Sequence, residues 1–258
     1  MKHEEYEAIQ AMNWGTLVHM ATSPLACQFR MEKERRDTEA FALGRAIHCA
    51  VLEPERFAAE YTEKPEGLSF ATKEGKAWRA AHEGQAIADA AVLRCRDAIM
   101  AHPVAADLLR QCPRREETIC WTDEQAGIKC KGRLDALGSG QMIDIKSTKA
   151  LITYRKDFSS YRVHGQMAWY LDGAATAKVL PPDAPCYIIA VETNEPYDVG
   201  MFPLDQVTVE VGRRLWRRLL DLYAQCSETG IWPGMFPAPE SMTLMPWADG
   251  MNEPMGDW

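Results

Sequence analysis

The sequence lacks the features that mark proteins of a membrane or of the secretory route. A membrane-spanning helix needs about eighteen consecutive apolar residues, and no stretch of the sequence comes near that length. The first residues, MKHEEY, are not followed by the apolar segment of a signal peptide. We therefore expect a cytoplasmic protein that neither spans a membrane nor is secreted.

Its eight cysteines include no C-x-x-C pair, the spacing that is typical of metal-binding and redox-active cysteines. Several of them lie within apolar stretches, where free cysteines behave as small buried hydrophobic residues. A reducing compartment suits such thiols, so the cysteines also indicate a cytoplasmic protein.

The chain also lacks an excess of basic residues, since 37 acidic side chains outnumber 29 basic ones and give a net charge of −8. Affinity for nucleic acid comes largely from cationic contacts with phosphate, so a uniformly basic DNA-binding surface is excluded. The basic residues are nevertheless grouped, and we expect a basic channel in an acidic exterior, lined by Lys129, Lys131, Arg133, Lys146, Lys149, Arg155, Lys156 and Arg162. The alternative is that these charges only keep strand edges in water.

The most informative segment that the sequence does contain lies at positions 132–146 and has the sequence GRLDALGSGQMIDIK. The Gly and Ser residues in its middle favour a tight turn between two strands. If Ser139 and Gly140 form the loop, Asp135 lies directly opposite Asp144, and Lys146 projects from the same face as Asp144. Two facing carboxylates repel each other, so this arrangement is disfavoured unless a cation lies between them.

These three side chains have the chemistry of a metal-dependent phosphodiesterase site. Mg²⁺ prefers carboxylate, water and phosphate oxygens, and Asp135 and Asp144 would supply two of them. A bound divalent ion lowers the pKa of water and acts as a Lewis acid on the phosphate, while Lys146 adds positive charge in the transition state. An Asp-x-Lys triplet by itself is equally compatible with an exposed ion pair at a strand edge.

Two further motifs flank this segment. Upstream, Gly44 and His48 are four residues apart in an apolar stretch with helical periodicity. Downstream, Gln166 and Tyr170 have the same spacing and so lie on one face of an expected helix. Taken singly, such residues mostly pack or form hydrogen bonds in the core. The order of histidine, Asp135, Asp-x-Lys, glutamine and tyrosine is more specific than any one part.

This order resembles the PD-(D/E)XK nuclease superfamily and, over the chain to near residue 230, the exonuclease VIII (RecE-type) family of phage and prophage recombination exonucleases. The passages that carry the likeness are HCAVLEPERF (48–57), GRLD (132–135), DIKST (144–148) and VETNEPY (191–197). Leu134 occupies the place of the proline in the superfamily's name, a position that varies within it. The resemblance implies an α/β fold with a central mixed sheet flanked by helices and an N-terminal helical region.

The resemblance also implies roles for individual residues. The metal ligands would be His48, Asp135 and Asp144. Lys146 would orient or polarise the attacking water and the scissile phosphate, and Gln166 and Tyr170 would contact the DNA backbone or the phosphate near the metal. Mg²⁺ would be the cofactor, and Mn²⁺ would substitute for it because an imidazole is among the ligands. No iron–sulfur cluster is expected, because the C-terminal cysteine trio of cluster-binding relatives is missing.

The implied function is that of an exodeoxyribonuclease that degrades linear double-stranded DNA from its ends, 5′ to 3′. Its products would be single strands for recombination with a strand-annealing protein, and the enzyme would be a homo-oligomer, a ring-shaped tetramer. Polarity, processivity and the ring come from the resemblance and not from the residues. Three alternatives stay open: a structure-specific or single-strand nuclease of the same superfamily, a degenerate nuclease fold that serves in DNA binding or assembly without catalysis, and a metal-dependent hydrolase that acts on a small phosphoester.

Residues 1–230 are expected to form one nuclease domain. Its helical preface covers about 1–112, including a second helical stretch from about 72 to 110, and its sheet core covers about 113–230. Strands are expected at about 116–123, 127–137, 141–147, 186–191 and 197–202, and helices at about 161–173 and 204–230. Residues 231–258 are a Pro-, Trp- and Met-rich tail, in which Trp247 and Trp258 would anchor on a neighbouring subunit or on the same domain.

Three acidic residues have roles that the sequence leaves open. Glu116 and Glu117 begin the first expected strand and could supply the additional acid that many relatives place near the metals. Glu192 is either an acid close to the site or the ordinary end of a strand.

Overall fold

The computed structural model describes residues 3–33, 38–65 and 67–242. The first part of the chain contains α1 (His3–Ala8), α2 (Trp14–Leu17), the 3₁₀ helix η1 (Val18–Ala21), α3 (Pro24–Glu32), α4 (Glu39–Leu52), α5 (Pro54–Glu60), β1 (Tyr61–Glu63), α6 (Lys73–Ala81), β2 (Ala86–Ala88), α7 (Ala90–Ala101) and α8 (Pro103–Gln111). The second part contains β3 (Arg114–Asp123), β4 (Ile128–Leu137), β5 (Met142–Thr148), α9 (Leu151–Ser160), α10 (Val163–Thr176), β6 (Cys186–Glu192), β7 (Val199–Pro203) and α11 (Gln206–Thr229).

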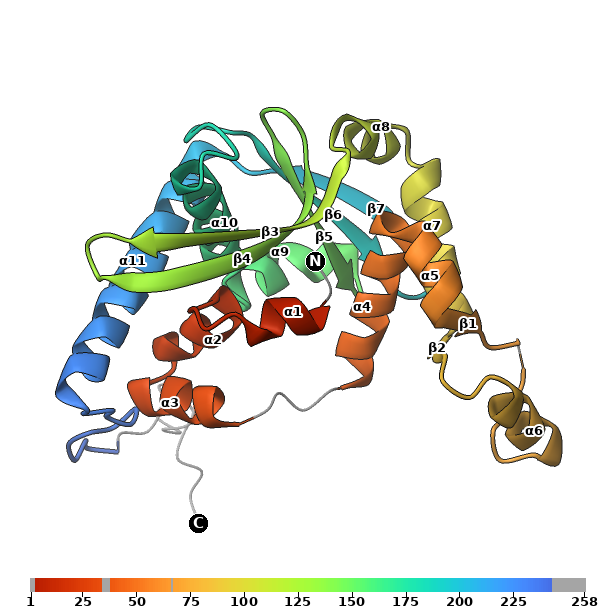
Figure 1. The fold of residues 1–258 in the computed structure, drawn as a ribbon, viewed down its shortest axis with the longest axis horizontal. Helices are drawn as coiled ribbons and strands as arrows, with labels where there is room; N and C mark the ends of the chain where they lie inside the picture. The colour runs from red at the N-terminus through yellow and green to blue at the C-terminus, as the bar shows by residue number, and fades with distance from the viewer. Residues whose placement is uncertain (1–2, 34–37, 66, 243–258) are drawn as a thin grey trace, which may run out of the picture.

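A five-stranded sheet forms the centre of the molecule (Figure 1). Its strand order is β3-β4-β5-β6-β7, in which β5 and β6 run parallel and the other neighbours antiparallel. A parallel pair needs a crossover connection, and α9 and α10 supply it between β5 and β6. The predicted mixed sheet flanked by helices is confirmed.

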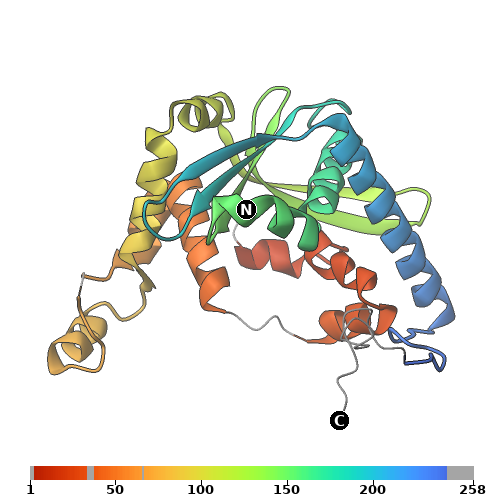
Figure 2. The same cartoon turned by 180° about the vertical axis from the view of Figure 1, so that it is seen from behind.

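The two faces of the sheet are covered by different helices (Figures 1 and 2). On one face, Ile143 and Ile145 of β5 pack with residues of α4, α7 and α8. On the other face, Met142 of β5 and Ile188 of β6 pack with residues of α9 and α10. Successive residues of a strand point to opposite faces, so the apolar runs of β5 and β6 are buried on both sides.

The preface differs from the prediction between residues 72 and 110, where the sequence predicts one helical stretch. The structure has three helices there, α6, α7 and α8, and the strand β2 lies between the first two and pairs in parallel with β1. Gly84 follows α6 with a φ of 92°, a conformation that glycine adopts without steric cost. Pro103 begins α8, because a proline lacks the amide hydrogen that a helix interior needs but suits its first turn.

The first helix is fixed to the sheet through Lys131 of β4. The side chain of Lys131 is only 2% exposed, and its Nζ donates hydrogen bonds to the carbonyl oxygens of Tyr6 (2.7 Å) and Ile9 (3.0 Å). The same ammonium lies 4.3 Å from the centre of the Tyr6 ring. A buried charge needs partners of this kind, so these contacts hold α1 in place on β4 and stabilise the buried Lys131.

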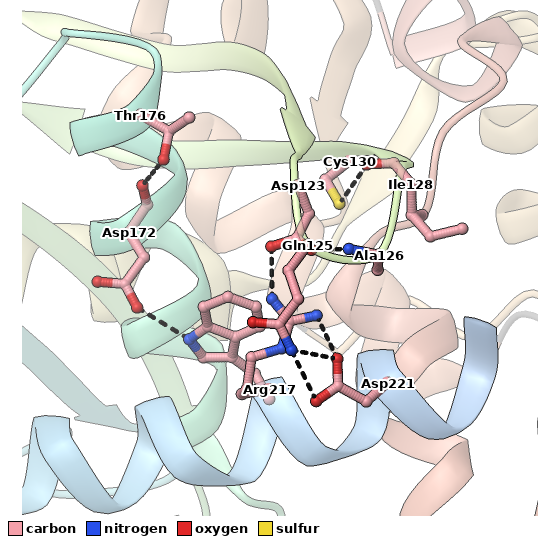
Figure 3. A network of polar contacts seen from close by, with 10 residues as sticks. Asp123, Gln125, Ala126, Ile128, Cys130, Asp172, Thr176, Arg217 and Asp221 are labelled. Carbon is pink, nitrogen blue, oxygen red and sulfur yellow. Dashed lines mark hydrogen bonds and ion pairs between the residues drawn. The ribbon is translucent and has the colours of Figure 1, made fainter. Parts of the chain in front are cut away.

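A polar network joins the turn between β3 and β4 to α11 (Figure 3). Arg217 Nη1 lies 2.6 Å from Asp123 Oδ2, and its Nη2 lies 2.7 Å from Asp221 Oδ1. Asp123 also accepts a hydrogen bond from the backbone N of Ala126 (2.8 Å), and Gln125 Nε2 donates to Asp221 (3.2 Å). Each acid of this network therefore has a cation and a further donor.

The beginning of the tail folds back on the domain. Trp232 lies against Tyr223 of α11, with ring centres 5.7 Å apart, and the carbonyl of Pro233 accepts a hydrogen bond from Leu25 N (3.1 Å). Residues 243–258, which include Trp247 and Trp258, lie outside the described residues. Among the helices that the structure describes, none is both long and apolar enough to cross a membrane.

Candidate active site

β4 and β5 form a hairpin that brings two acids together. The amide of Gly138 donates across the turn (2.9 Å) and closes a two-residue loop. The ladder pairs Leu137 with Met142 and Ala136 with Ile143, and it ends there. Asp135 and Asp144, which the sequence predicts to face each other, are the next residues of the two strands.

The side chain of Asp135 takes the place of a backbone partner where the two strands separate. Its Oδ2 accepts a hydrogen bond from the backbone N of Ile145 at 2.7 Å. A buried amide needs an acceptor, and here the carboxylate supplies it instead of the neighbouring strand. The position of Asp135 is therefore fixed by the fold itself.

Glu116 of β3 completes a row of three acids. Arg115 pairs with Ala136 and Glu117 with Leu134, so Glu116 is level with Asp135. The backbone of Glu116 has a φ of 48°, which is rare for a residue other than glycine. Such a conformation costs about 1–3 kcal/mol and is often found at functional sites. Acids on three neighbouring strands thus stand side by side, an arrangement that like-charge repulsion disfavours.

His48 of α4 lies beside this row. Its Nδ1 is 3.4 Å from Asp135 Oδ2, and the ligand atoms of His48, Glu116 and Asp135 all lie within 4.8 Å of one another. One helical turn earlier, a Cβ added to Gly44 would lie 3.6 Å from Ser147 Oγ of β5. The G-x-x-x-H spacing therefore places the glycine against the strand and the histidine at the acids.

Each acid of the row has a basic neighbour. Glu116 Oε2 lies 2.6 Å from Arg133 Nε, and Asp144 forms an ion pair with Lys146. Asp144 and Lys146 are two residues apart on β5, so they project from the same face. The protein thus supplies its own positive charges to a set of carboxylates that would otherwise repel one another.

The pKa values show how incomplete this compensation is. Burial raises the pKa of Glu116 to about 7 and that of Asp144 to about 6, and the charge of Asp135 adds to both shifts. Burial would lower the pKa of His48, but Asp135 outweighs it and raises this pKa to about 9. Burial would raise the pKa of Asp135, but His48 outweighs it and the pKa is lowered. Protons are therefore held at this site near neutral pH.

The donor set fits a hard divalent ion. Carboxylate oxygens suit Mg²⁺ and Mn²⁺, an imidazole favours Mn²⁺ as well, and a metal ion would compete with the protons held here. The convergent group differs from the predicted ligand set, because Glu116 belongs to it whereas Asp144 faces Lys146. The neighbouring Glu117 is turned away from the row, and its Oε1 lies 2.6 Å from Arg114 Nη2.

Gln166 and Tyr170 lie on α10. This helix packs on one face of the sheet, and α4 packs on the opposite face. Gln166 Nε2 donates to the hydroxyl oxygen of Tyr170 at 3.1 Å. A Cβ added to Gly132 of β4 would lie 3.0 Å from the Tyr170 ring, so this glycine makes room for the tyrosine. Burial, with the nearby charges of Tyr6 and Asp144, raises the pKa of Tyr170 well above its ordinary value, so its hydroxyl stays protonated.

Other predicted residues have different surroundings. Glu192 Oε1 accepts a hydrogen bond from the backbone N of Leu151 (2.7 Å), so this acid fixes the start of α9. The expected basic channel is wrong in two of its members, because Lys131 is buried against α1 and Arg133 is paired with Glu116. Alternation along β4 could not show this, since it does not reveal which element covers a strand.

Comparison with known proteins places the chain in a family. Residues 17–240 match the family described as a PDDEXK-like domain of unknown function, DUF3799. The chain belongs to this family. The description agrees with the sheet and with the row of acids on β3, β4 and β5, and it assigns the DUF3799 chain to the nuclease-like PD-(D/E)XK folds.

Solved structures support the same fold. A presumed exonuclease from Eubacterium rectale superposes with a TM-score of 0.58 at 11% sequence identity, over 89% of this DUF3799 chain and 87% of that protein. SSO0001 is 12% identical over 83% of this chain and 88% of its own, but its TM-score of 0.30 carries no structural argument. No curated protein matches the sequence.

Proposed function

We propose that this protein is a metal-dependent exodeoxyribonuclease that degrades linear double-stranded DNA from its ends. The observation that carries the proposal is the row of Glu116, Asp135 and Asp144 on three adjacent strands, with His48 and Lys146 beside it. A set of acids that the fold holds together against repulsion is typical of a site for divalent ions. The PDDEXK-like family supports a phosphodiesterase in particular.

The preference for DNA ends is supported by two likenesses to other proteins. The motif order from His48 to Tyr170 resembles the exonuclease VIII (RecE-type) family, and the E. rectale protein of the same fold is described as a presumed exonuclease. That resemblance also supports 5′ to 3′ polarity, a ring-shaped homo-oligomer and a strand-annealing partner for the single-stranded product. These finer features are part of the proposal.

In the proposed reaction a divalent ion would be held by His48, Glu116 and Asp135, with Asp144 at their side, and Mg²⁺ or Mn²⁺ would supply Lewis-acid activation of water and phosphate. Lys146 would donate hydrogen bonds and positive charge to a phosphoryl oxygen as negative charge builds up there. Asp144 orients the Lys146 ammonium through their ion pair.

Gln166 and Tyr170 would position the phosphate strand from α10. Tyr170 keeps its proton, so its hydroxyl can donate to a phosphate oxygen while it accepts from Gln166. Gln166 has a second amide hydrogen for the same purpose. Hydrogen bonds of this kind fix the position of the phosphate without adding to the charge of the site.

The test is the release of acid-soluble nucleotides from linear duplex DNA labelled at its 5′ or 3′ end, with Mg²⁺, Mn²⁺ or EDTA. Closed circular duplex is the control substrate, and Asp144→Ala is the control protein. We expect digestion of linear DNA only, with either metal, none in EDTA and none by the variant. The labels assign the polarity.

Other results would separate the alternatives. Attack on single strands or branched DNA but not on blunt duplex ends would indicate a structure-specific or single-strand nuclease. DNA binding without cleavage in Mg²⁺ or Mn²⁺ would sink the enzyme proposal and leave a nuclease fold that serves in binding or assembly.

A further inference from the structure

A concave basic surface lies away from the row of acids, where three helices meet. It is a concavity of about 470 Å³ between the end of α9, the start of α10 and the middle of α11, and its polar lining consists of Ser159, Ser160, Arg162, His164, Arg214 and Arg218. We call these six residues the basic concavity. In the view from behind, α9 (green), α10 (teal) and α11 (blue) converge on one side of the sheet (Figure 2).

The arginines of α11 divide into two kinds. Arg213 Nε lies 2.9 Å from Asp172 Oδ1, and Arg217 is held by Asp123 and Asp221. The next residue in each case, Arg214 or Arg218, is exposed and has no ion pair within the described part of the chain. Adjacent residues of a helix point about 100° apart, so one arginine of each pair faces the protein and the other faces the basic concavity.

Arg214 and Arg218 are spaced so that they repel each other. Like charges at positions i and i+4 of a helix are neighbours on its surface and destabilise it by a few tenths of a kcal/mol, roughly 0.2–0.5. Arg162 adds a third positive charge from the other wall, and it too has no ion pair among the described residues. The surface therefore concentrates cations that only an external anion would neutralise.

The backbone that forms this concavity is unusual at two points. Arg162 has a φ of 55°, a left-handed conformation that side chains rarely adopt and that often accompanies a functional site. Gly212 of α11 lets the two helices touch, because a Cβ there would lie 2.2 Å from the carbonyl oxygen of His164. Without that close approach, Arg214 and Arg218 could not share a concavity with the start of α10.

α10 connects this surface with the candidate active site. Gln166 and Tyr170 lie one turn apart on one side of α10, and Arg162 directly precedes its first turn. Eight residues span about 12 Å of helix, at about 1.5 Å per residue. A strand of B-form DNA advances about 3.4 Å per nucleotide, so this distance corresponds to about three to four nucleotides.

We propose that the basic concavity binds the phosphate backbone of the nucleic-acid substrate, about three to four nucleotides from the phosphate that is cleaved. The guanidinium groups would bind phosphate oxygens through paired hydrogen bonds, and Ser160 would add a hydroxyl donor, whereas the Ser159 hydroxyl donates to the Arg155 carbonyl oxygen (3.1 Å). This proposal rests on the proposed function, because it takes the substrate to be DNA. It also accounts for DNA binding by a chain of net charge −8.

The test measures binding without cleavage. A fluorescent linear 20-base-pair duplex is titrated in EDTA, at several salt concentrations, with wild type and with the double variant Arg214→Gln/Arg218→Gln. We expect the Kd to rise by about 10- to 100-fold and the slope of log K against log salt to fall by about 2, since each lost phosphate contact removes about 0.9. With Mg²⁺, kcat/KM should fall by a similar factor while kcat at saturating DNA changes little.

The matched control is Arg94→Gln. Arg94 is an exposed arginine of α7, on the other side of the sheet from α10, so its loss changes the net charge but not the basic concavity. We expect wild-type affinity and salt dependence from it. Arg214→Lys keeps the charge but not the paired hydrogen bonds and should give an intermediate Kd, which tests the site even where the double variant is unstable.

Several outcomes would overturn the proposal. If wild type binds and cleaves DNA, and the double variant keeps its Kd and salt slope, the basic concavity is not a DNA site although the nuclease function stands. If wild type neither binds nor cleaves DNA, the proposed function fails as well. If DNA binding is unchanged but the double variant loses binding to vesicles that contain phosphatidylserine, the concavity recognises lipid headgroups instead.

Discussion

β3 has acidic clusters near both of its ends, and they are built in opposite ways. Near its end, Asp123 and the neighbouring Asp221 are each held by Arg217 and by a further hydrogen-bond donor (Figure 3). Near its start, Glu116 stands beside Asp135, and burial and like charge raise its pKa to about 7. Asp123 and Asp221 share Arg217 and so join β3 to α11. Glu116 and Asp135 stay close enough to raise the pKa of Glu116 although each has a basic neighbour, an arrangement that suits a further cation.

The two clusters should therefore respond differently to the same kind of change. Neutralising an acid of the paired network removes an attraction, which lowers stability and leaves the chemistry alone. Neutralising Glu116 or Asp144, whose pKa values are raised, removes a repulsion together with a proposed metal contact, which lowers activity and leaves or raises the stability of the metal-free protein. Neutralising Asp135 lowers activity too, but it also removes the attraction to His48. Four predictions follow from this contrast.

The largest effect is expected from Asp135→Asn. This change keeps an oxygen acceptor for the Ile145 amide but removes the charge at the centre of the row. We expect kcat/KM on linear DNA to fall by about 1,000-fold. The Tm of the metal-free protein should fall as well, because the lowered pKa of Asp135 means that its charge stabilises the fold through His48. Cleavage assays and a thermal melt in EDTA check both. Activity within tenfold of wild type would remove Asp135 from the metal site.

Asp123→Asn should lower stability without lowering activity. The change leaves an acceptor for Ala126 but removes the ion pair with Arg217, and we expect the free energy of unfolding to fall by about 2 kcal/mol. Cleavage per folded molecule at low temperature should be unchanged. Urea titration is the measurement, and Asp107→Asn, which breaks an exposed pair with Arg110, is the control with an expected change below about 0.5 kcal/mol.

Glu116→Gln should weaken metal binding by about tenfold. Its carboxylate belongs to the group whose ligand atoms converge, whereas the adjacent Glu117 is turned towards Arg114. Calorimetric titration with Mn²⁺ measures the Kd, and Glu117→Gln is the matched control, with an expected Kd equal to that of wild type. Equal weakening by both substitutions would show that only the general negative charge of this end of β3 matters.

The smallest effect is a dependence of stability on pH. The pKa values of Asp144, Glu116 and His48 are raised to about 6, 7 and 9, so each group binds its proton more tightly in the folded state. The stability that these protons contribute is fully present below the unfolded pKa values, about 4 for the acids and 6.5 for histidine, and is lost as pH rises through the folded values. Asp135 has a lowered pKa, so it contributes stability above about pH 4 that is constant across this range.

We therefore expect the Tm of the metal-free protein to fall by several degrees between about pH 5 and pH 9. Thermal melts in EDTA at a series of pH values measure this, and Mn²⁺ should reduce the slope because it replaces the protons. In Glu116→Gln the fall around pH 7 should be smaller. A Tm that rises steadily with pH in EDTA would contradict the raised pKa values.

Much of the sheet core could be predicted because its signals are local. The expected strands at 127–137 and 141–147 correspond to β4 and β5, since Ser139 and Gly140 mark the turn and a two-residue loop fixes the register. That register places Asp135 and Asp144 directly after the last paired residues of the ladder. The helix expected at 204–230 corresponds to α11 because its apolar positions follow helical spacing.

The features that were not predicted depend on contacts between distant segments. Alternation along β4 shows that Lys131 and Arg133 share a face, but not that α1 buries the first or that Glu116 pairs with the second. The break of the 72–110 stretch was hidden because alanine-rich sequence suits a helix throughout, although Pro103 marked one of the boundaries. The sequence offered both Glu116 and Glu117 as the additional acid near His48 and Asp135. Only the pairing of β3 with β4 shows that Glu116 is the one beside them.

The hydrogen bonds of Lys131 bear on how this domain should be delimited. The family match begins at residue 17, which leaves α1 outside it, yet the carbonyl oxygens of Tyr6 and Ile9 solvate the ammonium of Lys131 on the strand that carries Asp135. A protein trimmed to the aligned boundaries would lose these acceptors and the cover of Lys131, and it would also lose Met12 and Trp14 from the core. The family match thus outlines a smaller unit than the one whose residues pack together, because the strand that carries Asp135 contacts a segment that the alignment omits.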